Sequence, residues 1–172
     1  MNRAFVKDPD DSGRPEDVPE RPQSPHPNYV TPAGLRQLEA LAADLAARLH
    51  DLREAGKLAD PHELAVVQRD LRWAEGRLQR AILVDPADQA PDRVRFGMTV
   101  EVCDEAGEAA TYTIVGEDEA DPALGKLSWA SPLAEALLHA EPGDEVVWRR
   151  PAGTKRLEIL AIRPGQGEGA GA

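Results

Sequence analysis

Two stretches of heptad-spaced apolar residues, separated by a short turn, constrain the fold of this chain more than any other feature. In each stretch, apolar residues recur at alternating spacings of three and four, which places them on one narrow stripe of a helix. The two stripes consist of Leu35, Leu38, Ala42, Leu45, Leu49 and Leu52, and of Leu64, Val67, Leu71, Ala74, Leu78 and Ala81. Each stripe can be buried only against the other, so the sequence predicts an antiparallel helical hairpin.

Capping residues indicate where the two predicted helices begin and end. Thr31, which a proline follows, is typical of an N-cap, because the proline's missing N–H is not needed in the first turn. Gly56 can adopt the left-handed conformation that ends a helix, and Asp60 with its following proline begins the next helix. We therefore expect a turn over residues 55–59, at the tip of a stalk about 35 Å long at a rise of about 1.5 Å per residue.

Composition limits the classes of function. The chain has 172 residues and a formal net charge of −11, which disfavours unaided binding to nucleic acid, because phosphate affinity depends on clustered Lys and Arg. Cys103 is the only cysteine, so the sequence excludes an internal disulfide and a cysteine-based zinc site. No apolar run approaches the roughly 18 residues of a membrane span, and the N-terminus lacks the apolar core of a secretory signal. We expect a cytoplasmic protein that does not bind membranes.

After the hairpin, the apolar period changes from that of a helix to that of a strand. Apolar residues alternate with polar or small ones, as in a strand with one buried face. The alternating set is Val94, Phe96, Met98, Val100 and Val102, and further apolar or β-branched runs lie at 112–115, 126–129, 145–149 and 156–162. A Ser-Pro pair at 131–132 predicts the start of one short helix. The sequence therefore predicts an α+β domain of about five antiparallel strands and one helix.

These signals divide the chain into five parts. We expect a disordered acidic and proline-rich tail over residues 1–29, because it has too few apolar residues to offset the entropy of ordering. The coiled-coil hairpin follows at 30–83, a Pro/Asp linker at 84–92 and the C-terminal domain at 93–163. A second disordered tail, rich in Gly and Ala, is expected at 164–172.

Several motifs, in the same order along the chain, resemble the bacterial GreA/GreB transcript cleavage factors. The hairpin motifs are VTPAGLRQL (30–38), REAG (53–56) and AEGRL (74–78), and those of the C-terminal domain are YTIVGEDEAD (112–121), SPLAEALL (131–138), GDEVVW (143–148) and PAG (151–153). The resemblance covers roughly residues 29–163. It implies an antiparallel coiled coil followed by an FKBP-like antiparallel β domain with one short helix.

The resemblance also implies a partner and a mechanism. It implies a protein that binds RNA polymerase with its globular domain and passes its hairpin down the polymerase's secondary channel. In the family, acidic tip residues help to hold a second catalytic Mg²⁺, and the polymerase then cleaves its own backtracked RNA. The implied protein is a monomeric accessory factor with no catalytic residues and no cofactor of its own. It would share the Mg²⁺ of the polymerase and meet nucleic acid only within the polymerase complex.

The tip departs from the family pattern at the residues that would contact the metal. The family tip reads approximately G-D-L-x-E-N, whereas residues 56–61 here read G-K-L-A-D-P. Lys57 replaces the first acid, and its ammonium group would repel a Mg²⁺ that prefers carboxylate oxygens. Asp60 is the acid left at a motif position and the candidate metal ligand, with Glu63 and Glu54 as further candidates. Two interpretations of Asp60 stay open, a helix cap alone or a cap that also contacts the metal.

The arms of the hairpin are also shorter than the family pattern. About eight residues are missing between Gly34 and Gly56, and about eight more between Glu75 and Phe96. Paired losses keep the register of the two helices, but they would shorten the stalk by about 12 Å. Because metal coordination needs contact near 2 Å, we expect the tip to stop short of the polymerase's catalytic metal.

The candidate docking residues are Ser131, Pro132 and Leu133. The resemblance implies that they meet a coiled coil at the rim of the polymerase channel. On the residues alone, Ser131 is also explained as the N-cap of the short helix. Ala130 replaces an acid that is often found there in the family.

The sequence thus predicts a Gre-like transcription regulator that binds RNA polymerase and stimulates RNA cleavage weakly or not at all. One alternative is an active cleavage factor that rescues backtracked polymerase through Asp60. A second alternative, prompted by the FKBP-like fold, is a peptidyl-prolyl isomerase, although fold alone does not confer that activity and no aromatic-lined proline pocket stands out in the sequence. A purely structural coiled-coil adaptor is the third.

Overall fold

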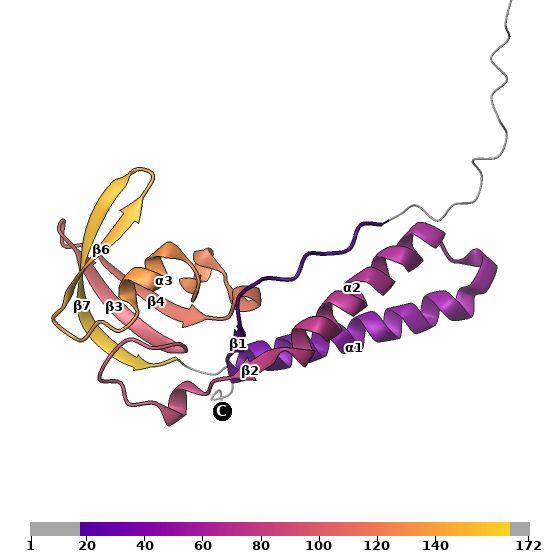
Figure 1. Ribbon diagram of the computed structural model, residues 1–172, viewed down its shortest axis with the longest axis horizontal. Coiled ribbons are helices and arrows are strands. Elements are labelled where there is room, and N and C mark those ends of the chain that lie inside the picture. The colour runs from indigo at the N-terminus through magenta and orange to yellow at the C-terminus, as the bar shows by residue number, and fades with distance from the viewer. Residues whose placement is uncertain (1–17, 166–172) are drawn as a thin grey trace, which may run out of the picture. The chain divides into compact units, whose positions relative to one another are not determined.

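The computed structural model describes residues 18–165, which form two compact units (Figure 1). The hairpin unit comprises residues 18–23 and 40–76, and the β unit comprises residues 24–39 and 77–165. Residues 1–17 and 166–172, in which most of the two predicted disordered tails fall, lie outside the described residues.

Two helices form the predicted hairpin. Helix α1 spans Pro32–Ala55 and helix α2 spans Pro61–Gln79, and a 3₁₀ turn at Gly56–Leu58 joins them (Figure 1). Gly56 has a φ of 56°, the left-handed conformation that glycine adopts at little cost. Thr31 caps α1, because its Oγ1 accepts a hydrogen bond from the N–H of Gly34 at 3.1 Å. The antiparallel hairpin and its tip turn are therefore confirmed.

The apolar seam of the hairpin unit follows the heptad pattern. Its buried residues are Leu49, Leu52 and Val67, and Leu45, Ala59, Leu64 and Leu71 pack against them half-buried. The residues between these positions are largely exposed on α1. This cluster is one side chain thick, as expected when two narrow stripes bury each other.

The β unit contains a five-stranded sheet in the order β5-β4-β3-β7-β6. Its strands are β3 (Met98–Asp104), β4 (Ala109–Val115), β5 (Lys126–Ser128), β6 (Glu145–Arg150) and β7 (Gly153–Pro164). All pairings are antiparallel except that of β5, which runs parallel to β4. The reason is that two 3₁₀ turns, at Glu117–Glu119 and Pro122–Leu124, carry the chain back before β5 begins.

The first strand of this sheet begins later than the alternating pattern predicts. β3 starts at Met98, because Gly97 has a φ of 83° and interrupts the extended conformation. Val94 is nevertheless fully buried, since its N–H donates to the carbonyl of Ala140 at 2.8 Å and its own carbonyl accepts from His139. The alternation thus identified buried residues correctly but extended the strand too far toward the N-terminus.

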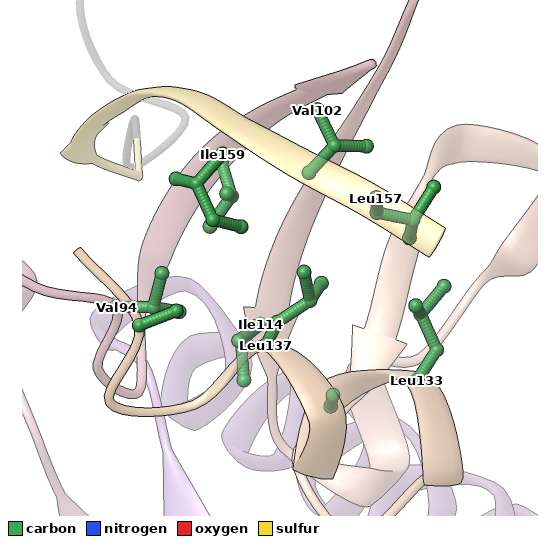
Figure 2. Packing of buried hydrophobic residues seen from close by; sticks show 10 residues of the cluster. Val94, Val102, Ile114, Leu133, Leu137, Leu157 and Ile159 are labelled. Carbon is green, nitrogen blue, oxygen red and sulfur yellow. The ribbon is translucent and has the colours of Figure 1, made fainter. Parts of the chain in front are cut away.

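Helix α3 (Pro132–Leu137) covers one face of the sheet and completes the core of the β unit. Figure 2 shows Leu133 and Leu137 of this helix directed toward Ile114 of β4, with Leu157 and Ile159 of β7 beside them. The predicted architecture, a helical hairpin followed by an antiparallel β domain with one short helix, is confirmed, and only the parallel pairing of β5 departs from it.

A small parallel sheet precedes the main one and was not predicted. β1 (Asn28–Val30) pairs with β2 (Ala81–Leu83). The predicted disordered tail reached residue 29, whereas the structure holds residues 28 and 29 in β1. Asn28 is 2% exposed and its amide donates to the carbonyl of Arg77 at 2.8 Å, so a buried polar contact replaces the missing apolar residues. The other predicted domain boundaries stay predictions.

Candidate functional site

Asp60 lies at the tip of the hairpin and caps α2. Its Oδ1 accepts a hydrogen bond from the backbone N–H of His62 at 2.9 Å, and its carbonyl accepts from Leu64 at 3.0 Å. The capping interpretation is therefore confirmed. The side chain is exposed, and a metal contact through this carboxylate stays a prediction.

Glu63 is engaged with the opposite helix of the hairpin. The Nε of Arg48 in α1 donates to Glu63 Oε1 at 3.0 Å, and the Nη2 of the same guanidinium also contacts that oxygen. This hydrogen bond raises the pKa of Arg48 above its ordinary value. Glu63 thus joins α1 to α2 one turn below the tip, and a metal ion would have to compete with a guanidinium for its carboxylate.

The outermost residues of the tip are a cation and a leucine. Lys57 and Glu54 are exposed, and Leu58 is 93% exposed. Within residues 18–165, no group of three or more His, Cys, Asp and Glu side chains is arranged to hold a metal ion.

The β unit carries a groove of about 600 Å³ beside α3. It is lined by Tyr112, Pro122, Leu127, Ser131, Pro132, Leu133, Trp148, Arg149, Arg150, Pro151 and Ala152. The guanidinium of Arg150 lies 5.1 Å from the centre of the Trp148 ring, a cation–π contact. The groove therefore combines an apolar, aromatic lining with two cationic side chains.

The structure separates the three candidate docking residues by exposure. Ser131 Oγ accepts from the N–H of Ala134 at 3.3 Å, so it caps α3, and Pro132 is exposed. Leu133 is only 5% exposed and belongs to the core, so it contributes the floor of the groove and not a protruding contact. Its apolar neighbours on α3 and β4 bury it.

Sequence reasoning missed the aromatic lining of the groove. Tyr112 and Trp148 lie on β4 and β6, which are not neighbours in the sheet. Tyr112 lies between two threonines and Trp148 between Val147 and Arg149, and such strand positions are also typical of a core. Only the sheet order and the α3 connection place both rings at one groove.

A buried arginine at the end of α2 was also missed. Arg77 is 1% exposed; its Nε donates to Asp118 Oδ2 at 2.6 Å and its Nη2 to Asn28 Oδ1 at 2.5 Å. Glu119, the next acid of the same loop, accepts from the N–H of Thr31 at 3.2 Å. The acidic residues after β4 therefore hold the residues at the start of α1 and at the end of α2, whereas their sequence gives no indication of partners.

Comparison with known proteins places these features in a family. The family described as "Transcription elongation factor, GreA/GreB, C-term" matches residues 88–164. Transcription elongation factor GreB of Neisseria meningitidis serogroup B is 38% identical over 151 residues, which cover 78% of this chain and 93% of that protein. Transcription elongation factor GreA of Pseudomonas syringae pv. tomato is 41% identical over 121 residues, covering 69% of this chain and 77% of the relative. A solved GreA/GreB structure from Nitrosomonas europaea is 26% identical, covers 78% of this chain and 98% of that chain, and has a TM-score of 0.39.

The fold and the candidate sites define a coiled-coil hairpin protein with an antiparallel-rich β domain that carries a groove beside α3. The identity to GreB over nearly the whole length of that relative determines the family. The chain belongs to the GreA/GreB family of transcription elongation factors. No helix within the described part of the chain is long and apolar enough to cross a membrane.

Proposed function

We propose that this protein binds RNA polymerase as an accessory factor, inserts its hairpin into the secondary channel and stimulates RNA cleavage weakly or not at all. Membership of an elongation-factor family supports the binding. The composition of the tip, with Lys57 at its end, is the observation that carries the rest. The protein would act as a monomer in the cytoplasm and bind no cofactor of its own.

The tip offers little to a magnesium ion. Lys57 places a positive charge beside the position that a shared Mg²⁺ would occupy, and Mg²⁺ prefers carboxylate and water oxygens. Asp60 uses one carboxylate oxygen as a helix cap, and Glu63 is paired with Arg48. Glu54 is the remaining candidate acid, and it lies on α1 before the turn. A tip of this kind can occupy a channel without completing a metal site.

The length of the hairpin supports the same conclusion. α1 has 24 residues and α2 has 19. The alignment with the meningococcal GreB runs over 151 residues but takes in only 78% of the 172 residues of this chain. This chain therefore contributes fewer residues than the alignment is long, as two shortened arms require. A stalk about 12 Å shorter would keep the tip out of coordination distance.

The groove of the β unit supports the docking part of the proposal. Hydrophobic grooves commonly bind the apolar face of an amphipathic helix, and a coiled coil at the channel rim would present such a helix. Ser131 and Pro132 lie on the wall beside α3, and Arg149 and Arg150 line the same groove. These cations would favour a rim helix with carboxylates facing them.

A cleavage assay on a stalled, backtracked elongation complex tests the tip. We expect the unmodified protein to compete with an active cleavage factor for the polymerase while releasing little RNA. If the charge of Lys57 alone limits cleavage, Lys57→Asp should restore it. If the length of the hairpin limits cleavage, Lys57→Asp should have no effect until two helical turns are also added to both arms. Asp60→Asn is the matched variant, since asparagine keeps the cap but removes the charge. Strong cleavage by the unmodified protein that Asp60→Asn abolishes would establish the active cleavage factor instead.

A binding assay tests the groove. Pro132→Glu changes an exposed residue of the groove wall, so we expect weaker polymerase binding and an unchanged unfolding temperature. Val147→Glu is the control, because Val147 is 46% exposed and alternates with Trp148 onto the other face of β6. Leu133 is unsuitable for this test, since a charge at a core position would unfold the domain. Equal binding by both variants would remove the groove from the interface.

A further inference from the structure

Residues 18–23, which we call the strap, lie along α2 within the hairpin unit (Figure 1). Their contacts with the helix are polar. Glu20 forms an ion pair with Arg72, and Arg21 forms one with Asp70 at 3.6 Å. The guanidinium of Arg21 also stacks over Trp73, 3.8 Å from the ring centre. The indole N–H of Trp73 donates to the carbonyl of Pro22 at 3.3 Å, and the Gln23 amide donates to the carbonyl of Trp73 at 3.2 Å. Every strap residue from 20 to 23 therefore has a partner on one helix.

The strap covers the side of α2 that the hairpin seam does not use. Asp70, Trp73 and Gly76 are spaced by three residues, so they follow one row along the helix. At 3.6 residues per turn, Asp70 borders the stripe of Val67, Leu71 and Ala74, whereas Trp73 and Gly76 lie about 100° or more from it. Trp73 is not part of the seam cluster, and tryptophan is a residue type enriched at the centres of protein interfaces.

Gly76 marks the end of the covered row. A Cβ at this position would lie 2.9 Å from the amide nitrogen of Gln23, closer than such atoms approach without a shift. Glycine in a helix interior is unfavourable relative to alanine. Gly76 therefore leaves room for the amide end of the Gln23 side chain beside the helix backbone.

The strap is nevertheless held weakly. Residues 19–23 are all exposed, and the side chains of Arg72 and Glu20 are 55% and 64% exposed. Ion pairs with this exposure contribute little and weaken further with salt. The covalent link to the β unit at residue 24 keeps the strap at a high effective concentration, which compensates for weak contacts. A partner that supplies the same contacts can therefore displace it.

We propose that the row of Asp70, Trp73 and Gly76 is a polymerase-binding surface, and that the strap is a tethered competitor that keeps it covered until the hairpin docks. This inference rests on the proposed function, because it assumes that the hairpin enters the polymerase. The displacing segment is a stretch of polymerase polypeptide that offers a cation to the indole face, a carbonyl to the indole N–H and a carboxylate to Arg72. It takes the place of Arg21, Pro22 and Glu20.

The strap then sets the apparent affinity. If only a fraction of the molecules is in the binding-competent state, the apparent Kd equals the intrinsic Kd divided by that fraction. If the strap is closed in about nine molecules of ten, its release should tighten polymerase binding about tenfold. Salt weakens the ion pairs that hold the strap on α2. The difference in polymerase affinity between the unmodified protein and a variant with a released strap should therefore become smaller as the salt concentration rises.

Polymerase affinity of the full chain and three variants tests the proposal. Glu20→Ala with Arg21→Ala releases the strap without a change in net charge, and we expect about tenfold tighter binding. Glu105→Ala with Arg156→Ala removes a comparable surface ion pair of the β unit and should bind like the unmodified chain. The third variant carries Gln23→Cys, Gly76→Cys and Cys103→Ser and is closed by a short bis-maleimide cross-link. We expect it to bind at least tenfold more weakly than its own uncross-linked form.

The outcomes separate the strap from the docking itself. Equal affinity of the released, unmodified and cross-linked proteins, with polymerase binding intact, would overturn the strap proposal alone. Weaker binding by the released variant would also overturn it, because the strap would then be part of the interface. If even the control variant and the unmodified chain fail to bind polymerase, both the proposed function and this inference are wrong. Thermal unfolding of each variant shows that the comparison is made between folded proteins.

Discussion

The hairpin and the β domain bury their apolar residues in different ways. Among the described residues, the hairpin cluster has three buried side chains, and all of them come from two helices that follow one another in the chain. The cluster of the β domain has ten, and it joins β3 with β7, whose paired residues are about sixty positions apart. Local contacts form quickly and cost little chain entropy, whereas distant pairings must repay a larger loop closure.

The difference shows how one chain can combine a thin helical stalk with a close-packed domain. The hairpin buries one stripe and leaves its remaining surface, including Leu58 and Lys57, open to solvent. The β domain buries both Leu133 and Leu137 beneath a groove that stays preformed. A thin stalk suits insertion into a channel, and a close-packed domain suits a rigid binding site.

The largest loss of stability is expected from a truncation in the core of the β domain. Leu137 of α3 is fully buried against the sheet, so Leu137→Ala should leave a cavity and lower the free energy of unfolding by about 4 kcal/mol. Denaturant unfolding followed by the fluorescence of Trp129 and Trp148 measures this loss. A loss below about 1 kcal/mol would mean that the domain collapses around the cavity and is less rigid than its packing indicates.

Arg77→Met is expected to lower the free energy of unfolding almost as much as Leu137→Ala. The substitution keeps the volume but leaves Asp118 and Asn28 without their buried partner, and breaking such a pair costs about 3 kcal/mol. Arg156→Met is the control, because Arg156 is exposed and should change stability by less than about 0.5 kcal/mol. The same denaturation experiment measures both variants. Equal effects would show that the buried arginine contributes no more than a surface residue.

The seam of the hairpin should tolerate the same truncation better. Leu49 is 7% exposed in a cluster one side chain thick, so Leu49→Ala should cost about 2 kcal/mol, because the helices can close part of the cavity. Circular dichroism at 222 nm reports the helices. Because Trp73 lies on α2, the fluorescence of Trp129 and Trp148 is measured in a Trp73→Phe background, where it reports the β domain. A loss equal to that of Leu137→Ala, seen by both probes, would mean that the two parts unfold as one cooperative unit.

The smallest expected effect is the dependence of stability on pH. Lys155 Nζ lies 2.7 Å from Asp104 Oδ2, and this hydrogen bond lowers the pKa of Asp104 below its ordinary value. The stabilisation is therefore complete above the unfolded pKa of about 4 and disappears as pH falls through the lowered folded pKa. Asp104→Asn should be less stable than the unmodified protein at pH 7, and the difference should vanish in acid.

A matched variant in the hairpin sharpens this comparison. Glu63 also carries an ion pair, with Arg48, but its side chain is 39% exposed, whereas that of Asp104 is 5% exposed. Glu63→Gln should therefore lose less stability at about pH 7 than Asp104→Asn, because solvent screens an exposed pair. Thermal unfolding at about pH 7 measures both variants. A larger effect of Glu63→Gln than of Asp104→Asn would mean that the ion pair of the hairpin stabilises the protein more than that of the β domain.

The sequence by itself determined the hairpin, the tip and the content of the β domain. Heptad spacing, a glycine stop and the caps at Thr31 and Asp60 act within a few residues, so their outcome depends little on the rest of the chain. The same holds for the cap at Ser131. The order of the motifs between residues 29 and 163 also indicates the family.

Only the tertiary structure decided which distant residues meet. Alternation located the buried residues of each strand, but it could not show that β5 runs parallel to β4 or that Tyr112 and Trp148 line one groove. The burial of Arg77 depends on an acidic loop about forty residues away, and the strap depends on a helix about fifty residues away. These contacts gain their energy from side chains that chain folding brings together, so no local period or spacing encodes them.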